Sequence, residues 1–131
     1  MSSPGGEVPL ALRRWFLVHF WADIVFAVPL LVAPAWLLGL LGWDCVDLVS
    51  ARLVGAALVG IGVESLLGRN GSRDSFRTML RLKVLWSSTA TVGIAVSLAQ
   101  GAPVAALLFL VIFGGFCGLW SHWAWRLRGP A

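Results

Sequence analysis

Four long apolar segments are the feature of this sequence that most constrains its fold. They cover roughly residues 15–38, 48–67, 79–99 and 103–125. The hydrocarbon core of a bilayer is about 30 Å thick, and about 20 helical residues are needed to cross it. Each segment is therefore predicted to be a transmembrane helix. The composition agrees, because 59% of the residues are hydrophobic and only 12% are charged, about half the charged fraction of a typical soluble domain.

Short connections join these segments, so nearly the whole chain is predicted to be embedded in the membrane. The fold class is all-α: a polytopic membrane protein built as a four-transmembrane-helix bundle. We assign residues 1–10 to a disordered N-terminal tail and residues 11–128 to a single transmembrane domain. Within these 131 residues we expect no separate soluble catalytic domain.

The basic residues indicate how the helices are oriented in the membrane. They precede the first segment, surround the second connection and follow the fourth segment: Arg13, Arg14, Arg69, Arg73, Arg77, Arg81, Arg126 and Arg128. The first connection carries Asp44 and Asp47, and the third carries no charge. Because positively charged loops stay in the cytoplasm, we expect an N-in/C-in protein of a bacterial inner membrane. The net charge of +4 then reflects topology, and no nucleic-acid partner is expected.

Small residues mark the surfaces on which the helices are expected to pack. At about 100° per residue, the second segment places Ala51, Gly55 and Gly62 on one side. Gly60 and Glu64 fall on the opposite side. Small residues on two sides allow two neighbouring helices to approach closely. The second helix is therefore predicted to lie centrally in the bundle.

Two further patterns concern the surface of the bundle. Gly114 and Gly118 form a GxxxG motif in the fourth segment, which fits either packing within the chain or association of two copies. Tryptophans lie near the span ends, where aromatic belts are expected at the membrane surfaces. They are Trp15, Trp36, Trp43, Trp120, Trp123 and Trp125.

Polar side chains from all four segments are predicted to lie at a similar depth, in the inner half of the membrane. They are His19, Asp23, Glu64, Lys83 and His122. Asp23 follows His19 by one helical turn, on the same face. Charges inside a membrane are costly and tend to face the bundle interior and to pair. Lys83 is the obvious partner for Asp23 or Glu64.

Two interpretations of this cluster stay open. The first is a closed ion pair that orients the helices. The second is a polar pocket open to the inner leaflet or the cytoplasm, with Asp23 and Glu64 as its acidic groups and Lys83, Ser87 and the histidines as its donors. Such a pocket would bind a lipid-like or amphiphilic small molecule with a polar or cationic head. The alternative function is that of an accessory or structural subunit of a larger membrane complex.

Haem is a minor alternative, because His19 and His122 are the only histidines and are expected near the same membrane surface. We expect no other cofactor and no other metal site. The sequence lacks the motifs typical of metalloproteases, hydrolases and phosphate-binding loops. We therefore expect a non-enzymatic protein. Its expected partners are membrane lipids, with a second copy of the chain or other membrane subunits as further alternatives.

The order of these features resembles the small bacterial four-helix membrane proteins of the DoxX-like type and uncharacterised groups near them. The residues that carry the likeness are "PLLVAPAWLLGLLG", which ends the first segment, and "ARLVGAALVGIG", which opens the second. The resemblance covers roughly residues 14–68 and implies a four-helix bundle without a particular chemistry. A similarity to the EXPERA-type sterol-binding proteins of eukaryotes is one of fold alone, since their longer outer connection is missing here.

Overall fold

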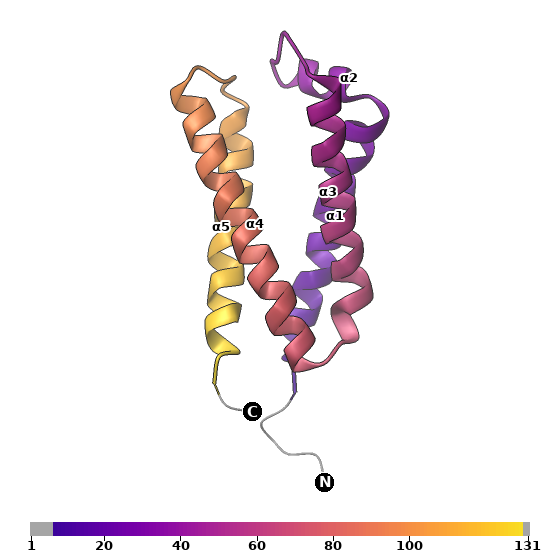
Figure 1. Cartoon of the computed structure of the whole chain (residues 1–131), viewed down its shortest axis with the longest axis vertical. Helices are drawn as coiled ribbons and strands as arrows, with labels where there is room; N and C mark the ends of the chain where they lie inside the picture. The colour runs from indigo at the N-terminus through magenta and orange to yellow at the C-terminus, as the bar shows by residue number, and fades with distance from the viewer. Residues whose placement is uncertain (1–6, 130–131) are drawn as a thin grey trace.

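The computed structural model describes residues 7–129, and in that range it contains only helices and the turns between them (Figure 1). The elements are α1 (Leu10–Val32), α2 (Pro34–Leu40), α3 (Leu48–Leu67), the 3-10 helix η1 (Gly68–Asn70), α4 (Arg73–Ala99) and α5 (Ala106–Arg126). Four helices, namely α1, α3 continued by η1, α4 and α5, are long and apolar enough to cross a membrane. The predicted all-α fold with four membrane-spanning helices is confirmed.

The first predicted span is divided in two by a proline. α1 ends at Val32 instead of continuing to residue 38, because Pro34 disfavours the helical conformation at the residue before it. Ala33 accordingly has φ −142° and ψ 60°, and Pro34 starts the short helix α2. Of the predicted tail, residues 1–6 lie outside the described residues. Val8 is already buried, and α1 begins at Leu10.

Two other helix starts also differ from the predicted spans, whereas α3 covers residues 48–67 as predicted. α4 begins at Arg73, six residues before the predicted start at residue 79. The Ser72 side chain caps this helix by accepting a hydrogen bond from the Ser75 amide at 3.2 Å. The first turn of α4 is polar, so it does not count toward an apolar segment. α5 begins at Ala106, after a turn that contains the predicted start at residue 103.

An aspartate fixes the start of α3. The Asp47 carboxylate accepts hydrogen bonds from the Ser50 hydroxyl and, at 3.1 Å, from the Val49 amide. These bonds, the one from Ser50 first, hold the pKa of the Asp47 carboxyl below its usual range. The negative charge also interacts favourably with the N-terminal end of the helix dipole.

Glycines on one face of α3 allow it to pack closely on α1. A Cβ added at Gly55 would lie 3.0 Å from a leucine side chain of α1, and one at Gly62 would lie 2.9 Å from Asp23 Cβ. Ala51, on the same face, is also buried. Gly60, on the opposite face, is exposed and has open space around its Cβ position. The predicted central position of this helix is therefore wrong: α3 packs through one face and presents the other outward.

The GxxxG motif of α5 contributes little packing within the described part of the chain. A Cβ added at Gly114 would contact only Thr91 of α4, at 3.9 Å. Gly118 is exposed, and nothing described lies within 4 Å of its Cβ position. The predicted packing role within the chain is thus limited to Gly114, and the association of two copies stays a prediction.

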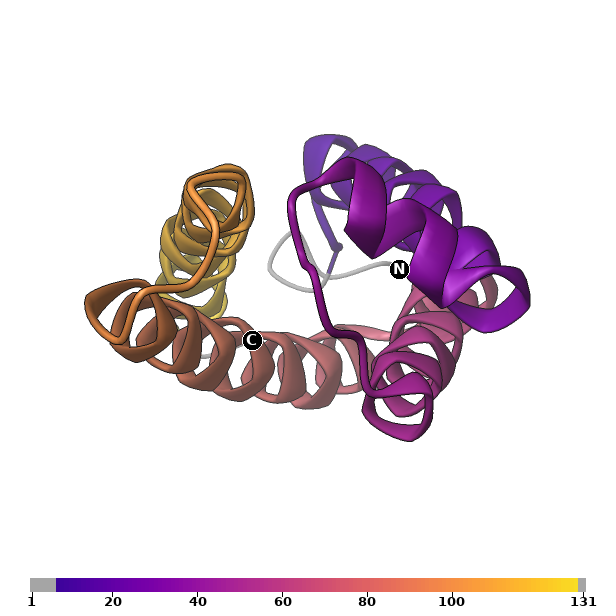
Figure 2. The same ribbon diagram turned by 90° about the horizontal axis from the view of Figure 1, so that it is seen from above.

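The four long helices form two pairs that meet mainly at one end. α1 packs along α3, and α4 packs along α5 (Figure 1). Figure 2, which looks along the bundle, shows α1 and α3 on one side and α5 on the other, with α4 running between them. The joined end contains a buried apolar cluster: Val8, Leu12, Phe16, Phe76, Met79, Leu80, Trp120, Trp123 and Leu127. Trp120 is 0% exposed, so it belongs to the core and not to a lipid-facing belt.

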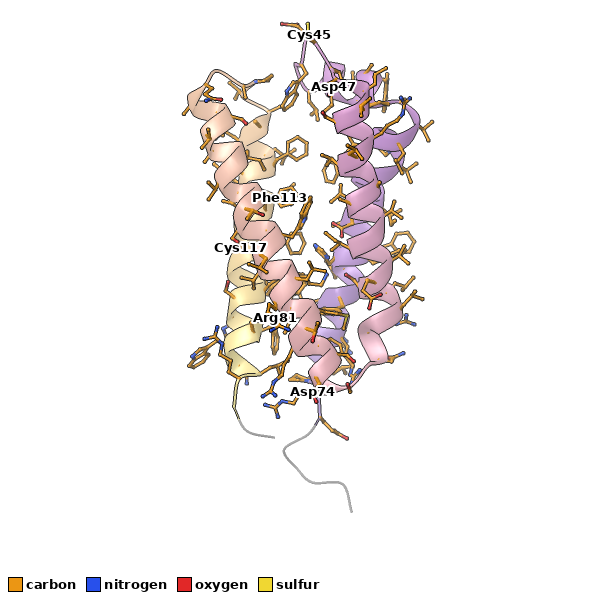
Figure 3. All side chains as sticks on the ribbon, in the orientation of Figure 1. Cys45, Asp47, Asp74, Arg81, Phe113 and Cys117 are labelled. Atoms are coloured by element: carbon orange, nitrogen blue, oxygen red, sulfur yellow. The ribbon has the colours of Figure 1, made fainter. Side chains whose placement is uncertain are left out.

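Basic side chains tie the chain segments together at this same end, which we call the basic end. Arg13 of α1 donates to the carbonyl oxygen of Arg69 at 2.7 Å. Arg77 of α4 donates to the carbonyl oxygen of Leu127, after α5, also at 2.7 Å. Figure 3 shows Cys45, in the connection between α2 and α3, at the opposite end of the bundle. The start of α1 and the end of α5 thus lie on one side, as an even number of spans requires.

Candidate functional site

Four buried polar side chains from three helices meet just beyond the apolar cluster of the basic end. His19 and Asp23 come from α1, Ser65 from α3 and Lys83 from α4, and each is at most 7% exposed. His19 and Asp23 are brought together because they lie one turn apart on the buried face of α1. Ser65 continues the packed face of α3, since it is one turn after Gly62. We call these four residues the polar cluster.

Lys83 is the centre of the polar cluster. Its ammonium group donates to His19 Nδ1 at 2.9 Å and to Ser65 Oγ at 2.5 Å. The same nitrogen lies 4.8 Å from the ring centroid of Phe16 and 5.1 Å from that of Trp120. Cations are attracted to aromatic faces at such distances. Hydrogen bonds and aromatic rings together therefore replace the water that this charge would have on the protein surface.

Asp23 is left with an oxygen atom that has no hydrogen-bond partner among the described residues. Its Oδ2 is buried and lies 3.3 Å from His19 Nδ1. An ammonium group has only donors, so the lone pair of His19 Nδ1 accepts from Lys83. That nitrogen then has no proton for Asp23, and two acceptors face one another. Burying an acceptor without a donor lowers the stability by about 1–3 kcal/mol. Asp23 Oδ2 is therefore the atom of the polar cluster whose hydrogen-bond partner is missing.

The predicted direct ion pair of Lys83 is not formed among residues 7–129, where neither Asp23 nor Glu64 makes an ion pair with it. Asp23 and Lys83 nevertheless contact the same His19 nitrogen, so they lie within about 6 Å of each other and attract through a medium of low polarity. Glu64 is exposed and is not part of the polar cluster. It lines a smaller cavity of about 230 Å³ on the other side of Ser65 and Lys83.

The two remaining predicted site residues have different positions. Ser87 is 2% exposed and one turn from Lys83, and its hydroxyl donates to the Lys83 carbonyl oxygen at 2.7 Å. His122 is exposed on α5, with its ring 5.6 Å from that of Trp123. His19 is buried, and its ring packs against Trp120 instead. The two histidines do not share a site in this structure, and haem ligation by both stays an untested prediction.

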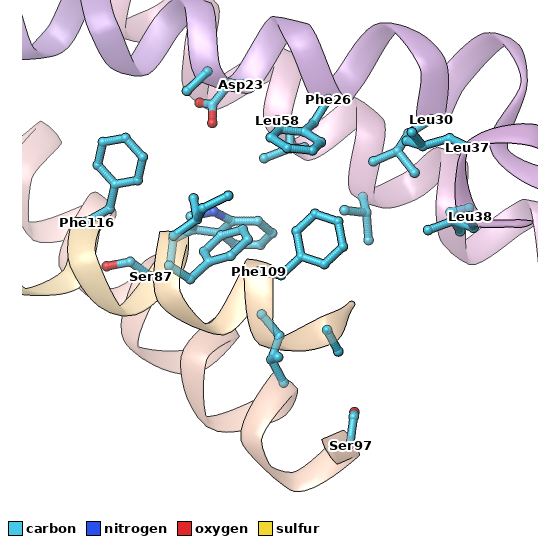
Figure 4. A pocket seen from close by; sticks show the side chains of 18 of the residues that line it. Asp23, Phe26, Leu30, Leu37, Leu38, Leu58, Ser87, Ser97, Phe109 and Phe116 are labelled. Carbon is cyan, nitrogen blue, oxygen red and sulfur yellow. The ribbon is translucent and has the colours of Figure 1, made fainter. Parts of the chain in front are cut away.

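An apolar cavity of about 340 Å³ begins at the polar cluster and continues between the two helix pairs, away from the basic end. His19, Asp23 and Ser87 line its inner part, and the remaining lining is mostly aromatic and aliphatic. Figure 4 shows the Asp23 carboxylate beside this space, with Phe26, Leu58 and Phe116 around it. The far end of the cavity is lined by residues near the opposite connections, including Leu38, Trp43 and Ala102.

The cavity differs in two ways from the predicted pocket. It extends from Asp23 toward the end opposite the basic end, whereas we expected an opening at the basic end. The packed apolar cluster fills that end instead. The cavity is also apolar along most of its length, so Asp23 is one polar point at its base and Glu64 and Lys83 do not line it. Phe109 of α5 packs against the other helix pair at this level. Its ring centroid lies 5.5 Å from that of Phe26 and 6.4 Å from that of Trp43.

Sequence reasoning missed Ser65, Phe16 and Trp120. Phe16 could have been found, because it precedes His19 by three residues and therefore shares its helix face. Ser65 extends the small-residue face of α3 in the same way. Among the described residues, no group of three or more histidine, cysteine, aspartate or glutamate side chains is placed to hold a metal ion. Comparisons with protein-family models, curated proteins and solved structures found no match to this chain.

Proposed function

We propose that this membrane protein binds a lipophilic small molecule in the cavity between its helix pairs and performs no catalysis. The observation that carries the proposal is the Asp23 carboxylate, which lines the base of an apolar cavity and accepts no hydrogen bond from the described residues. A ligand with an apolar body would fill the space, and a donor on its polar head would satisfy Asp23.

The size and the lining of the cavity support a small amphiphile. Ligand-binding pockets usually have volumes of about 300–1,000 Å³ and are lined by apolar and aromatic side chains around a few polar groups. At about 340 Å³, this cavity is at the lower end of that range. Its wall contains Phe26, Trp86, Phe109, Phe113 and Phe116. These rings offer a large contact area to a hydrocarbon chain or a compact ring system.

We further propose that the basic end faces the cytoplasm, which places both termini inside and the far end of the cavity in the outer half of the membrane. The gathering of Arg13, Arg69 and Arg77 at this end supports the orientation. A ligand would then enter from the outer leaflet or the outer surface. The resemblance to DoxX-like proteins agrees with a bacterial inner membrane as the location.

Cysteine labelling tests this orientation. Cys45 is exposed in the connection between α2 and α3, whereas Cys117 lies within α5. In intact cells, a membrane-impermeant maleimide is expected to label Cys45. In a Cys45→Ser background, Ser72→Cys is expected to stay unlabelled until the cells are opened. Labelling of Ser72→Cys in intact cells would reverse the proposed orientation.

Blocking the cavity tests the proposed binding. Ala106 lines the cavity, and Ala106→Phe is expected to lower the affinity for a twelve-carbon alcohol at least about tenfold by filling the space. Ala56 is exposed on α3 and lines no described cavity. Ala56→Phe is therefore the matched control and is expected to leave the affinity unchanged. Native mass spectrometry of the purified protein would measure the bound fraction.

Equal binding by both variants would contradict the proposal, because the molecule would then be held at the lipid-facing surface. The competing function, an accessory subunit of a larger complex, gives a different result. In that case the protein would be recovered in stable form only with other subunits, and it would bind no probe when purified alone.

A further inference from the structure

We propose that the cavity selects an amphiphile whose head is a neutral hydroxyl group, in preference to an ammonium or a carboxylate head. This inference rests on the proposed function and specifies the ligand class for the same site. It follows from the charges and hydrogen-bond capacities of the groups at the base of the cavity. Asp23, Lys83, His19 and Ser87 are the groups that decide it.

The polar cluster is already balanced in charge. When both groups are ionised, Asp23 supplies one negative charge and Lys83 one positive charge, and both contact His19 Nδ1. His19 accepts from Lys83 and adds no charge, and Ser65 is neutral. An ammonium head placed on Asp23 would bring a second positive charge close to Lys83. A net charge in surroundings of low polarity is unfavourable, so a neutral donor fits better than a cationic one.

A carboxylate head also fits less well, because it would bring a second negative charge beside the Asp23 carboxylate, which lines the cavity. That carboxylate accepts no hydrogen bond from the described residues. The Ser87 hydroxyl gives its proton to the Lys83 carbonyl oxygen and so offers only its lone pairs. The two protons of Lys83 that have assigned partners point to His19 and Ser65, and Lys83 does not line the cavity. A hydroxyl head can donate to Asp23 without introducing charge.

The test compares different polar head groups on the same twelve-carbon hydrocarbon chain. The protein in lipid nanodiscs is loaded with tritiated dodecan-1-ol, and specific binding is taken as the difference from Ala106→Phe. Unlabelled dodecan-1-ol, dodecylamine, dodecanoate and dodecane then compete at pH 7. We expect dodecan-1-ol to compete at a concentration about tenfold or more below that of the other three compounds. Dioleoylglycerol, which also has one hydroxyl but two long chains, is expected to compete weakly because the cavity is small.

A second variant tests the selectivity for the head group separately from binding in the cavity. Asp23→Leu/Lys83→Met removes both charges together, which proteins often tolerate. In this variant the preference for dodecan-1-ol over dodecane is expected to fall below about twofold, with dodecane binding retained. If dodecylamine or dodecanoate competes as well as the alcohol with the unaltered protein, the selectivity is wrong while binding stands. If dioleoylglycerol competes best, the ligand is a diacyl lipid. If no compound binds specifically, both proposals fail.

Discussion

Replacing Lys83 with methionine is expected to lower the free energy of unfolding by about 3–5 kcal/mol, the range found when one partner of a buried charge pair is removed. The change leaves the buried Asp23 carboxylate without a nearby positive charge. It also deprives His19 and Ser65 of the donor that they share. Reversible unfolding in mixed micelles of increasing dodecyl sulfate content, followed by tryptophan fluorescence, would measure the loss.

Three further variants show whether the lost charge is the cause. Arg81→Met removes an exposed cation two residues away and is expected to change the stability by less than about 0.5 kcal/mol. Adding Asp23→Asn to Lys83→Met is expected to restore most of the lost stability, because no buried charge then stays uncompensated. Glu64→Gln is expected to have little effect, since Glu64 is exposed. If Lys83→Met were no more destabilising than Arg81→Met, the polar cluster would not hold the helices together.

The second large effect is expected at Gly62, where Gly62→Val should lower the free energy of unfolding by about 3 kcal/mol. A Cβ at this position would lie 2.9 Å from Asp23 Cβ and 3.3 Å from Asp23 Oδ2. Such contacts force α3 away from α1, at the level of the polar cluster. The same unfolding experiment would measure the effect, and binding of dodecan-1-ol should weaken as well because Asp23 is displaced.

Gly60 provides the matched control on the same helix. Nothing lies within 4 Å of its Cβ position in the described structure, and it is exposed. Gly60→Val is therefore expected to change the stability by less than about 0.5 kcal/mol. Equal destabilisation by the two variants would mean that the effect comes from helix propensity, and the close approach of α1 and α3 at Gly62 would then be in doubt.

The sequence predicts the number of membrane-spanning helices and most of their extent, because hydropathy depends only on local composition. The bounds of α3 and the end of α4 at Ala99 are predicted correctly. The end of α1 and the start of α4 depend on local conformations that an apolar segment does not report, namely the restriction that Pro34 places on Ala33 and the cap that Ser72 gives to α4.

The sequence predicts which polar residues avoid the lipid better than it predicts which of them meet. His19, Asp23, Lys83 and Ser87 are all buried, as expected of polar groups in a membrane segment. Glu64 and Ser65 are adjacent in sequence, yet about 100° of helix rotation makes one exposed and the other buried. The cavity depends on how the two helix pairs diverge, and this is a property of long-range packing that no single segment encodes.

Mapping the site of a photoactivatable ligand tests the binding of an amphiphile beside Asp23 most directly. A twelve-carbon alcohol with a diazirine on its chain would be irradiated in nanodiscs with the protein, and the labelled residues identified by mass spectrometry. Labels are expected on the cavity residues Leu58, Phe113 and Phe116, and an excess of dodecan-1-ol should remove them. Labels confined to outward-facing residues such as Val25 and Val92, which are 64% and 63% exposed, would contradict binding in the cavity.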